Sequence, residues 1–177
     1  MDFLDKYKYF KDDPSEFEID PKEFKKNSNE LDESHLSNLL TNSIRVNKKI
    51  LPKVGKAIDL VFNRIKIENN FNFFVTADNT QANAACSLMS TASRPDIFLT
   101  SRLIELLSLE ELQFVIGHEI AHYVYQHALY PNYNRVEERN LKLNILTLSR
   151  AAEISADRIG FLSCSGLEHS LKALLKL

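Results

Sequence analysis

Apolar residues recur with helical spacing over long parts of the chain. One such stretch runs from about Asp32 to Arg64, and Pro52 and Gly55 within it predict a break or kink into two helices. Another is predicted to cover residues 141–164, with Ser149 as a candidate break point. A last helix is predicted after residue 166. The pattern therefore indicates a mostly helical protein.

A further helix is predicted to begin near Ser108. Ser108 and Glu111 form an S-x-x-E capping box directly ahead of the apolar stretch LQFVIGHEIAHYVY. The helix is expected to end before Pro131, and the polar segment PNYNRVEERN is expected to be a mobile connection to the next helix.

Three short segments read as strands rather than helices. They are FNFFVT (71–76), NAACSLMS (83–90) and DIFLTS (96–101). Because they lie close together in the chain, they predict one small sheet just before the helix that begins near Ser108. The expected fold class is α+β, mostly helical, with this sheet next to that helix.

The first thirty residues differ from the rest of the chain. Residues 1–30 are rich in Lys, Asp, Glu and Phe, and Pro14 and Pro21 interrupt them, so a partly ordered leader is expected before a domain over residues 31–177. The alternative is a segment that packs across the domain through Phe10, Phe17 and Phe24. The chain stops at SLKALLKL without a helix stop signal, which fits the front part of a longer protein.

Composition narrows the class of protein. The 177 residues are 44% hydrophobic and 26% charged, enough apolar material for one core. The net charge of −2 gives no support for nucleic-acid binding. Cys86 and Cys164 are far apart and form no zinc knuckle or disulfide framework. There is no signal-peptide pattern and no membrane-span pattern, so the expected location is the cytoplasm.

The helix that begins near Ser108 carries an HExxH motif, His118-Glu119-Ile120-Ala121-His122. Residues i and i+4 share one helical face, so both imidazoles can reach one metal ion. Glu119 lies about 100° around the helix, where it can accept a proton from a water molecule on the metal instead of binding the metal itself. Two histidines and one carboxylate suit zinc and leave a fourth position open.

The rest of this helix is predicted to be buried on most sides. Apolar residues surround it, and Gly117 and Ala121 form a strip of small side chains that predicts a close neighbouring backbone. Unpaired His and Glu side chains are uncommon in such a setting, which favours metal ligation for the motif.

A third metal ligand is needed from elsewhere in the chain. The metzincin pattern is excluded because Tyr125 and Ala128 stand where it requires Gly and His, and His127 is judged too far around the helix to join. Glu153 and Asp157 share one face of a later helix. Glu153 is the candidate ligand, and Asp157 is the candidate hydrogen-bond partner of a ligand histidine.

An ordinary surface helix remains open as the alternative for Glu153 and Asp157. In that case Glu153 would pair with Arg150, and Asp157 with Arg158 or Arg135.

HExxH followed by ExxxD resembles the gluzincin zinc peptidases of the HtpX and CAAX-prenyl-protease group. HEIAHYVYQH (118–127) is similar to the family's motif segment with a second downstream histidine, and AAEISADRIG (151–160) is similar to its third-ligand segment. The stretch from NAACSLMS into the motif helix also resembles the family, and the likeness covers roughly residues 65–177. In place of the Pro-Gly-Gly of many members, this chain has Leu88, Met89 and Ser90.

The resemblance implies a zinc-dependent endopeptidase that acts on a peptide or an unfolded protein, with Glu119 as general base. It also implies that the strand after Gln81, beginning with Asn83 and Ala84, pairs with an extended substrate. His169 is a candidate for a transition-state stabiliser, and the alternative is that it is an exposed histidine on a helix. The alternatives are a catalytically silent domain that binds a partner, and a latent enzyme whose leader plugs the cleft.

Overall fold

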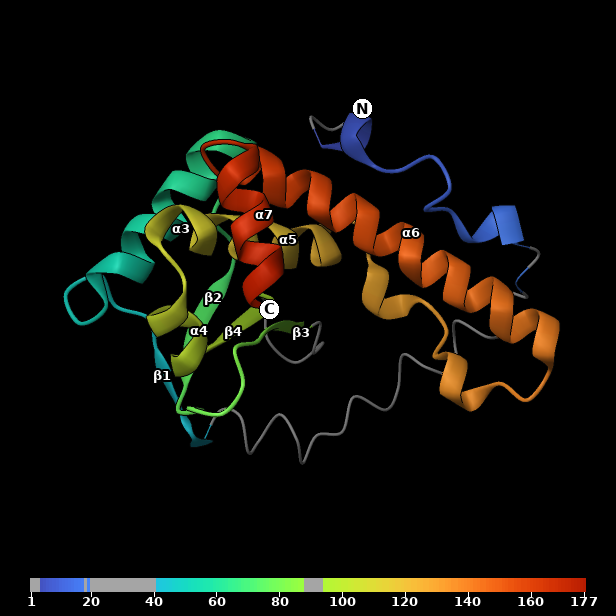
Figure 1. The fold of residues 1–177 in the computed structure, drawn as a ribbon, viewed down its shortest axis with the longest axis horizontal. Helices are drawn as coiled ribbons and strands as arrows, with labels where there is room; N and C mark the ends of the chain where they lie inside the picture. Colours follow the sequence, from blue (N-terminus) through green and yellow to red (C-terminus); the bar gives the residue numbers. More distant parts are fainter. Residues whose placement is uncertain (1–3, 18, 20–40, 88–93) are drawn as a thin grey trace.

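A computed structural model describes residues 4–17, 19, 41–87 and 94–177, and it consists of a small sheet and a set of helices (Figure 1). The strands are β1 (Ser43–Arg45), β2 (Asn72–Thr76), β3 (Ala84–Ser87) and β4 (Asp96–Thr100). Their order in the sheet is β1-β2-β4-β3; β2 and β4 are parallel, and the two outer strands pair antiparallel.

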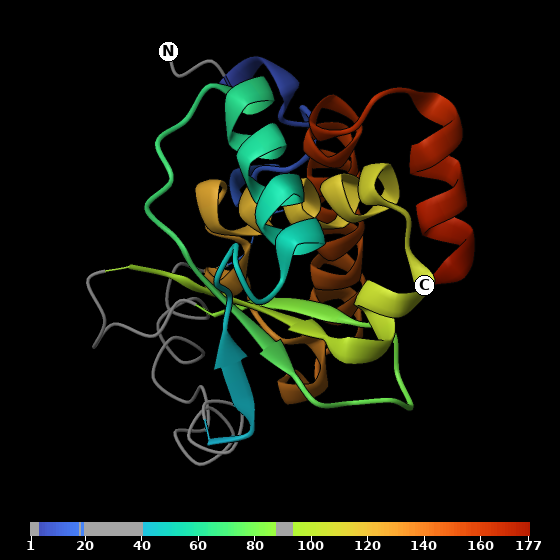
Figure 2. The same ribbon diagram turned by 90° about the vertical axis from the view of Figure 1, so that its left-hand side faces the viewer.

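The helices lie mainly to one side of this sheet, as the turned view shows (Figure 2). They are α3 (Pro52–Ile65), α4 (Ser101–Leu106), α5 (Leu109–Val124), α6 (Arg139–Ser163) and α7 (Leu167–Lys176). One apolar core joins α3, α5 and α6 to β2 and β4 through buried side chains that include Val61, Ile97, Leu112 and Ile159. The expected α+β class is confirmed.

Three local predictions are wrong. Residues 43–45, expected in a helix, form β1, because Ile44 and its neighbours pair with the edge of β2. Pro52 begins α3 at its first turn instead of breaking a helix, a position where its missing N–H costs nothing. Ser149 does not break α6, since its hydroxyl donates back to the carbonyl of Ile145 within one continuous helix.

One helix was not predicted at all. α4 follows β4 directly, and the Thr100 side chain caps it by accepting a hydrogen bond from the backbone N–H of Leu103. By contrast, the capping box that starts α5 is confirmed: Ser108 Oγ accepts from Glu111 N at 3.2 Å, and Glu111 Oε2 accepts from Ser108 N at 2.7 Å.

The strip of small residues on α5 does bring another backbone close. A Cβ added at Gly117 would lie 2.0 Å from Ser163 Oγ of α6, and one added at Gly160 would lie 2.9 Å from the carbonyl oxygen of Phe114. Side chains larger than hydrogen at these two positions would force α5 and α6 apart. The close crossing places residues 118–122 of α5 against residues 153–157 of α6.

Residues 4–17 form an N-terminal segment that lies along the outer side of α6 (Figure 1). Leu4 and Asp12 are fully buried there, and the backbone N–H of Tyr9 donates to Ser155 Oγ of α6 at 2.9 Å. Of the three phenylalanines expected to anchor this region, Phe10 is 73% exposed and Phe17 is partly buried against Ile145 and Leu148. Phe24 lies outside the described residues.

Within the described ranges no helix combines the length and the apolar character that crossing a bilayer requires. Cys86 and Cys164 are both free thiols, and Cys164 is buried in the core.

Candidate metal centre and peptide cleft

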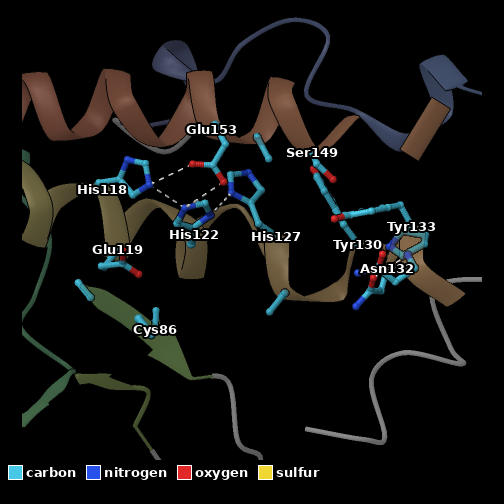
Figure 3. A pocket seen from close by; sticks show the side chains of 16 residues that line it. Cys86, His118, Glu119, His122, His127, Tyr130, Asn132, Tyr133, Ser149 and Glu153 are labelled. Carbon is cyan, nitrogen blue, oxygen red and sulfur yellow. Dashed lines mark hydrogen bonds and ion pairs between the residues drawn. The ribbon is translucent and has the colours of Figure 1, made fainter. Parts of the chain in front are cut away.

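His118, His122 and Glu153 converge at the crossing of α5 and α6, which makes them a candidate metal centre (Figure 3). His118 Nε2 lies 2.9 Å from His122 Nε2 and 3.3 Å from Glu153 Oε2, and His122 Nε2 lies 3.8 Å from Glu153 Oε1. The two imidazoles come from successive turns of α5, and the carboxylate reaches down from α6.

These separations fit a tetrahedral zinc ion. Ligands about 2.0–2.1 Å from zinc stand roughly 3.3 Å from one another along a tetrahedron edge. The distances from His118 Nε2 to His122 Nε2 and to Glu153 Oε2 lie near that value, and the 3.8 Å distance from His122 Nε2 is to the other carboxylate oxygen, Oε1. The donor set of two imidazole nitrogens and one carboxylate is that of a catalytic zinc site that keeps one position open. The residues present therefore fit the metal.

Asp157 lies one turn beyond Glu153 and faces the back of His118. His118 Nδ1 donates to Asp157 Oδ1 at 3.0 Å, which leaves Nε2 of the ring directed at His122 and Glu153. The arginine next to it, Arg158, is turned away and donates to the backbone carbonyls of Tyr7 and Lys8. The geometry is that of a carboxylate–histidine pair and not of a surface salt bridge.

Glu119 is half-buried and points to the opposite side of α5 from Glu153, toward β3 (Figure 3). Its carboxylate accepts a hydrogen bond from the backbone N–H of Cys86. Among the described residues it is not part of the cluster that could hold a metal. The carboxylate thus stands beside the cluster and lines the same cleft.

The electrostatics of the cluster reflect burial and close charges. Burial would lower the pKa of His118, but the carboxylates of Asp157 and Glu153 outweigh it and raise that pKa to about 9. Burial, with the charge of His118 added, lowers the pKa of His122 to about 4. Burial also raises the pKa of Glu119 to about 7, against the lowering effect of His118. In the absence of metal at pH 7, the His118 imidazole is therefore cationic and the His122 imidazole is neutral, with a single N–H.

Among the described residues His127 is not part of the cluster that could hold a metal, as expected, but it contacts the far side of the His122 ring. α5 ends at Val124, and Gln126 adopts a left-handed backbone (φ 59°), which turns the chain back on itself. His127 Nδ1 then lies 2.8 Å from His122 Nδ1, on the side of that ring away from the cluster. Its Nε2 lies 2.9 Å from Asp12 Oδ2 of the N-terminal segment.

Asp12 was not predicted from the sequence, because no local pattern links it to His127, which lies 115 positions later in the chain. The second downstream histidine of HEIAHYVYQH was the one available signal for His127, which was considered from the sequence only as a metal ligand and not as a partner of His122.

A cleft of about 640 Å³ opens in front of the cluster. One wall of the cleft is formed by residues 84–86 of β3. The other is formed by residues 130–134 together with Ser149, Ala152 and Glu153 of α6. The polar segment that was expected to be a mobile connection to the next helix therefore contributes residues 131–134 to the lining of this cleft. Such a volume holds a few residues of an extended peptide.

Of the two residues expected on a substrate-binding strand, only Ala84 borders this cleft. The Asn83 side chain turns back to accept from the N–H of Ala84, and Asn83 lines a separate hollow beside Arg102. Among the described residues β3 pairs with β4 alone, so it is an edge strand. His169 is half-buried on α7 and does not border the cleft.

Comparison with known proteins agrees with this site. The sequence model of peptidase family M48 matches residues 47–143 of the chain, a range that contains the HExxH motif. The chain belongs to peptidase family M48. The resemblance drawn from the motifs is thereby confirmed, and membership of M48 supports a metallopeptidase function. The matched range ends before Glu153 and Asp157. Glu153 is therefore assigned to the cluster from its position on α6 and not from the family match.

A curated relative is the plastoglobule-localized metallopeptidase 48, chloroplastic, of Arabidopsis thaliana. It is 28% identical over 107 residues, which cover 52% of this chain and 31% of the relative. The chain thus spans about a third of the relative's length. No solved structure matches the chain.

Proposed function

We propose that this M48 chain is a zinc-dependent endopeptidase that hydrolyses peptides or unfolded proteins. The observation that carries the proposal is the convergence of His118, His122 and Glu153 at tetrahedral spacing, with Glu119 beside them and an open cleft in front. Family membership supports it, because M48 is a family of metallopeptidases. Location in the cytoplasm stays a prediction, and the relative's printed name points to a chloroplast compartment for that protein.

In this proposal His118, His122 and Glu153 hold the zinc ion, and Asp157 holds the His118 ring so that Nε2 faces it. Zinc, when bound, acts as a Lewis acid that lowers the pKa of water and polarises a peptide carbonyl.

The Glu119 carboxylate takes a proton from the attacking water molecule, whose oxygen bonds to the peptide carbonyl carbon. Glu119 then gives that proton to the amine nitrogen, which leaves as the C–N bond breaks. The Cys86 N–H fixes one side of this carboxylate. The edge of β3 at Ala84 and Ala85 offers backbone groups to an extended substrate, which adds as a further strand and is oriented across the cluster.

Two alternatives keep the fold and change the activity. A silent domain would bind a peptide without cutting it, but the presence of Glu119 in a half-buried position favours an enzyme. A latent enzyme would need the N-terminal residues to plug the cleft. No described residue of the segment 4–17 lines the cleft.

The test combines metal analysis with proteolysis. Protein purified without added metal is expected to contain close to one zinc ion per chain and to cleave casein, an unfolded protein. The double variant His118→Ala, His122→Ala is expected to lose both the bound zinc and the cleavage of casein. Unchanged zinc content in that variant would disprove the site, and a zinc-loaded parent that cleaves neither casein nor short peptides would favour the silent domain.

A further inference from the structure

A buried chain of hydrogen bonds runs from the proposed metal ligand His122 to the N-terminal segment. His127 Nδ1 lies 2.8 Å from His122 Nδ1, and His127 Nε2 lies 2.9 Å from Asp12 Oδ2. The side chains of His127 and Asp12 are 5% and 0% exposed, so water does not compete for these contacts. A carboxylate this deeply buried is costly unless donors surround it.

Asp12 is surrounded by such donors. Besides His127, the hydroxyl of Tyr130 donates to Asp12 Oδ1 at 2.8 Å, and the hydroxyl of Ser155 on α6 donates to the same carboxylate. Burial alone would raise the pKa of Asp12, but these hydrogen bonds outweigh it and hold the pKa below its usual range. The carboxylate is therefore ionised and fixed in place.

Only one arrangement of hydrogens satisfies the whole chain while His122 Nε2 offers its lone pair to the cluster. The His122 hydrogen must then sit on Nδ1 and be donated to His127 Nδ1, which is left as an acceptor. The His127 hydrogen must sit on Nε2, where it is donated to Asp12. An ionised Asp12 favours this tautomer of His127, and that tautomer in turn favours the metal-binding tautomer of His122.

We propose that Asp12 and His127 are positioning residues that orient His122 for metal binding, so that the N-terminal segment completes the metal site. The inference rests on the proposed function. In this arrangement each of the two ligand histidines is oriented by a carboxylate: His118 by Asp157 directly, and His122 by Asp12 through His127. Residues 4–17 are on this basis part of the peptidase domain and not a dispensable leader.

The contact pattern of the segment agrees with that role. Besides Asp12, the backbone of Leu4 accepts a hydrogen bond from Tyr125 at 2.7 Å, and the backbone of Tyr9 donates to Ser155 at 2.9 Å. These contacts tie the segment to the end of α5 and to the middle of α6, the two helices that supply the cluster. Asp12 is thus held relative to both.

The test measures zinc affinity of the full chain by competition with a chelator of known affinity, next to the melting temperature. His127→Phe is expected to weaken zinc binding about 10–100-fold, the usual cost of losing the partner of a ligand histidine. Asp12→Asn, which keeps the shape and removes the charge, is expected to weaken it about tenfold.

The double variant Asp12→Asn, His127→Phe is expected to bind zinc no more weakly than His127→Phe alone, because Asp12 acts through His127. His127→Gln should retain affinity within about threefold of the parent, since its amide can both accept from His122 and donate to Asp12.

Two controls separate positioning from stability. Phe10→Ala changes an exposed side chain of the same segment, and Val61→Ala weakens the core on α3, away from the cluster; both should bind zinc like the parent. Additive losses in the double variant, or a folded Asp12→Asn with parental affinity, would overturn the inference. If Asp12→Asn does not fold, equal affinities of His127→Gln and His127→Phe would overturn it. A parent that binds no zinc would instead refute the proposed function.

Discussion

At the scale of single residues, two glutamates of the site, Glu153 on α6 and Glu119 on α5, have different surroundings. Glu153 lies with the imidazoles at 3.3 and 3.8 Å, whereas Glu119 is turned toward β3 and bonded to the Cys86 backbone. Burial gives Glu119 a pKa of about 7 without metal, and a nearby zinc ion lowers the pKa of a carboxylate. The same residue type is thus suited to binding a cation in one place and to moving a proton in the other.

Replacing Glu119 by glutamine tests this separation. Glu119→Gln keeps the shape of the side chain and its place beside β3, so zinc content and melting temperature should match those of the parent. Loss of the base should lower kcat for peptide hydrolysis by about 10²–10⁴-fold, with a smaller change in KM. Hydrolysis at the parental rate would show that another group takes the proton, and loss of zinc would show that Glu119 is a ligand.

At the scale of secondary-structure elements, the sequence predicts what local signals control. The capping box placed the start of α5, the short apolar segments FNFFVT and DIFLTS placed β2 and β4, and the i, i+4 spacing placed both pairs of site residues on their helix faces. Because such signals are local, they carry no information on what Ile44 pairs with, and β1 was mistaken for helix. No local pattern in the sequence indicates the left-handed backbone at Gln126, which decides where His127 lies.

The same capping box links two helices and gives a pH-dependent contribution to stability. Glu111 is 3% exposed, caps α5 through Ser108 N, and accepts from Lys176 Nζ of α7 at 2.7 Å. Burial would raise the pKa of Glu111, but the hydrogen bonds from Lys176 and Ser108 outweigh it and lower the pKa below 4.5. Above that value Glu111 is ionised in both the folded and the unfolded chain, and its stabilising effect is complete.

Glu111→Gln should therefore lower the free energy of unfolding at pH 7. As the pH falls below about 4.5, the unfolded chain takes up the proton first, so the parent loses this contribution and the difference from Glu111→Gln shrinks. Urea unfolding of both proteins between pH 7 and pH 3 measures this difference in the free energy of unfolding, with a chelator present to remove the effect of metal. A difference that stays constant over that range would contradict the assignment, and Glu168→Gln, at an exposed ion pair, is the matched control.

At the scale of the whole molecule, the proposed centre is assembled from distant parts of the chain. The family match over residues 47–143 contains the HExxH helix, whereas Glu153 and Asp157 follow it and Asp12 precedes it. The core that joins α3, α5 and α6 to the sheet is apolar and does not include the cluster. The fold should therefore form without metal, and a zinc ion between α5 and α6 should stabilise what is already folded.

Removing zinc gives a prediction for the entire chain. Zinc at 100 times its dissociation constant would contribute about 2.7 kcal/mol, because it binds the folded chain and not the unfolded one. For a chain of this size that corresponds to a fall in melting temperature of roughly 5–10 °C when the ion is chelated, while the circular dichroism spectrum at 20 °C stays that of a folded helical protein. The variant His118→Ala, His122→Ala should melt at the same temperature with zinc and with chelator. If the parent also melts at one temperature under both conditions, the ion does not join α5 to α6; if the chelated parent is unfolded at 20 °C, the apolar core alone does not hold the fold.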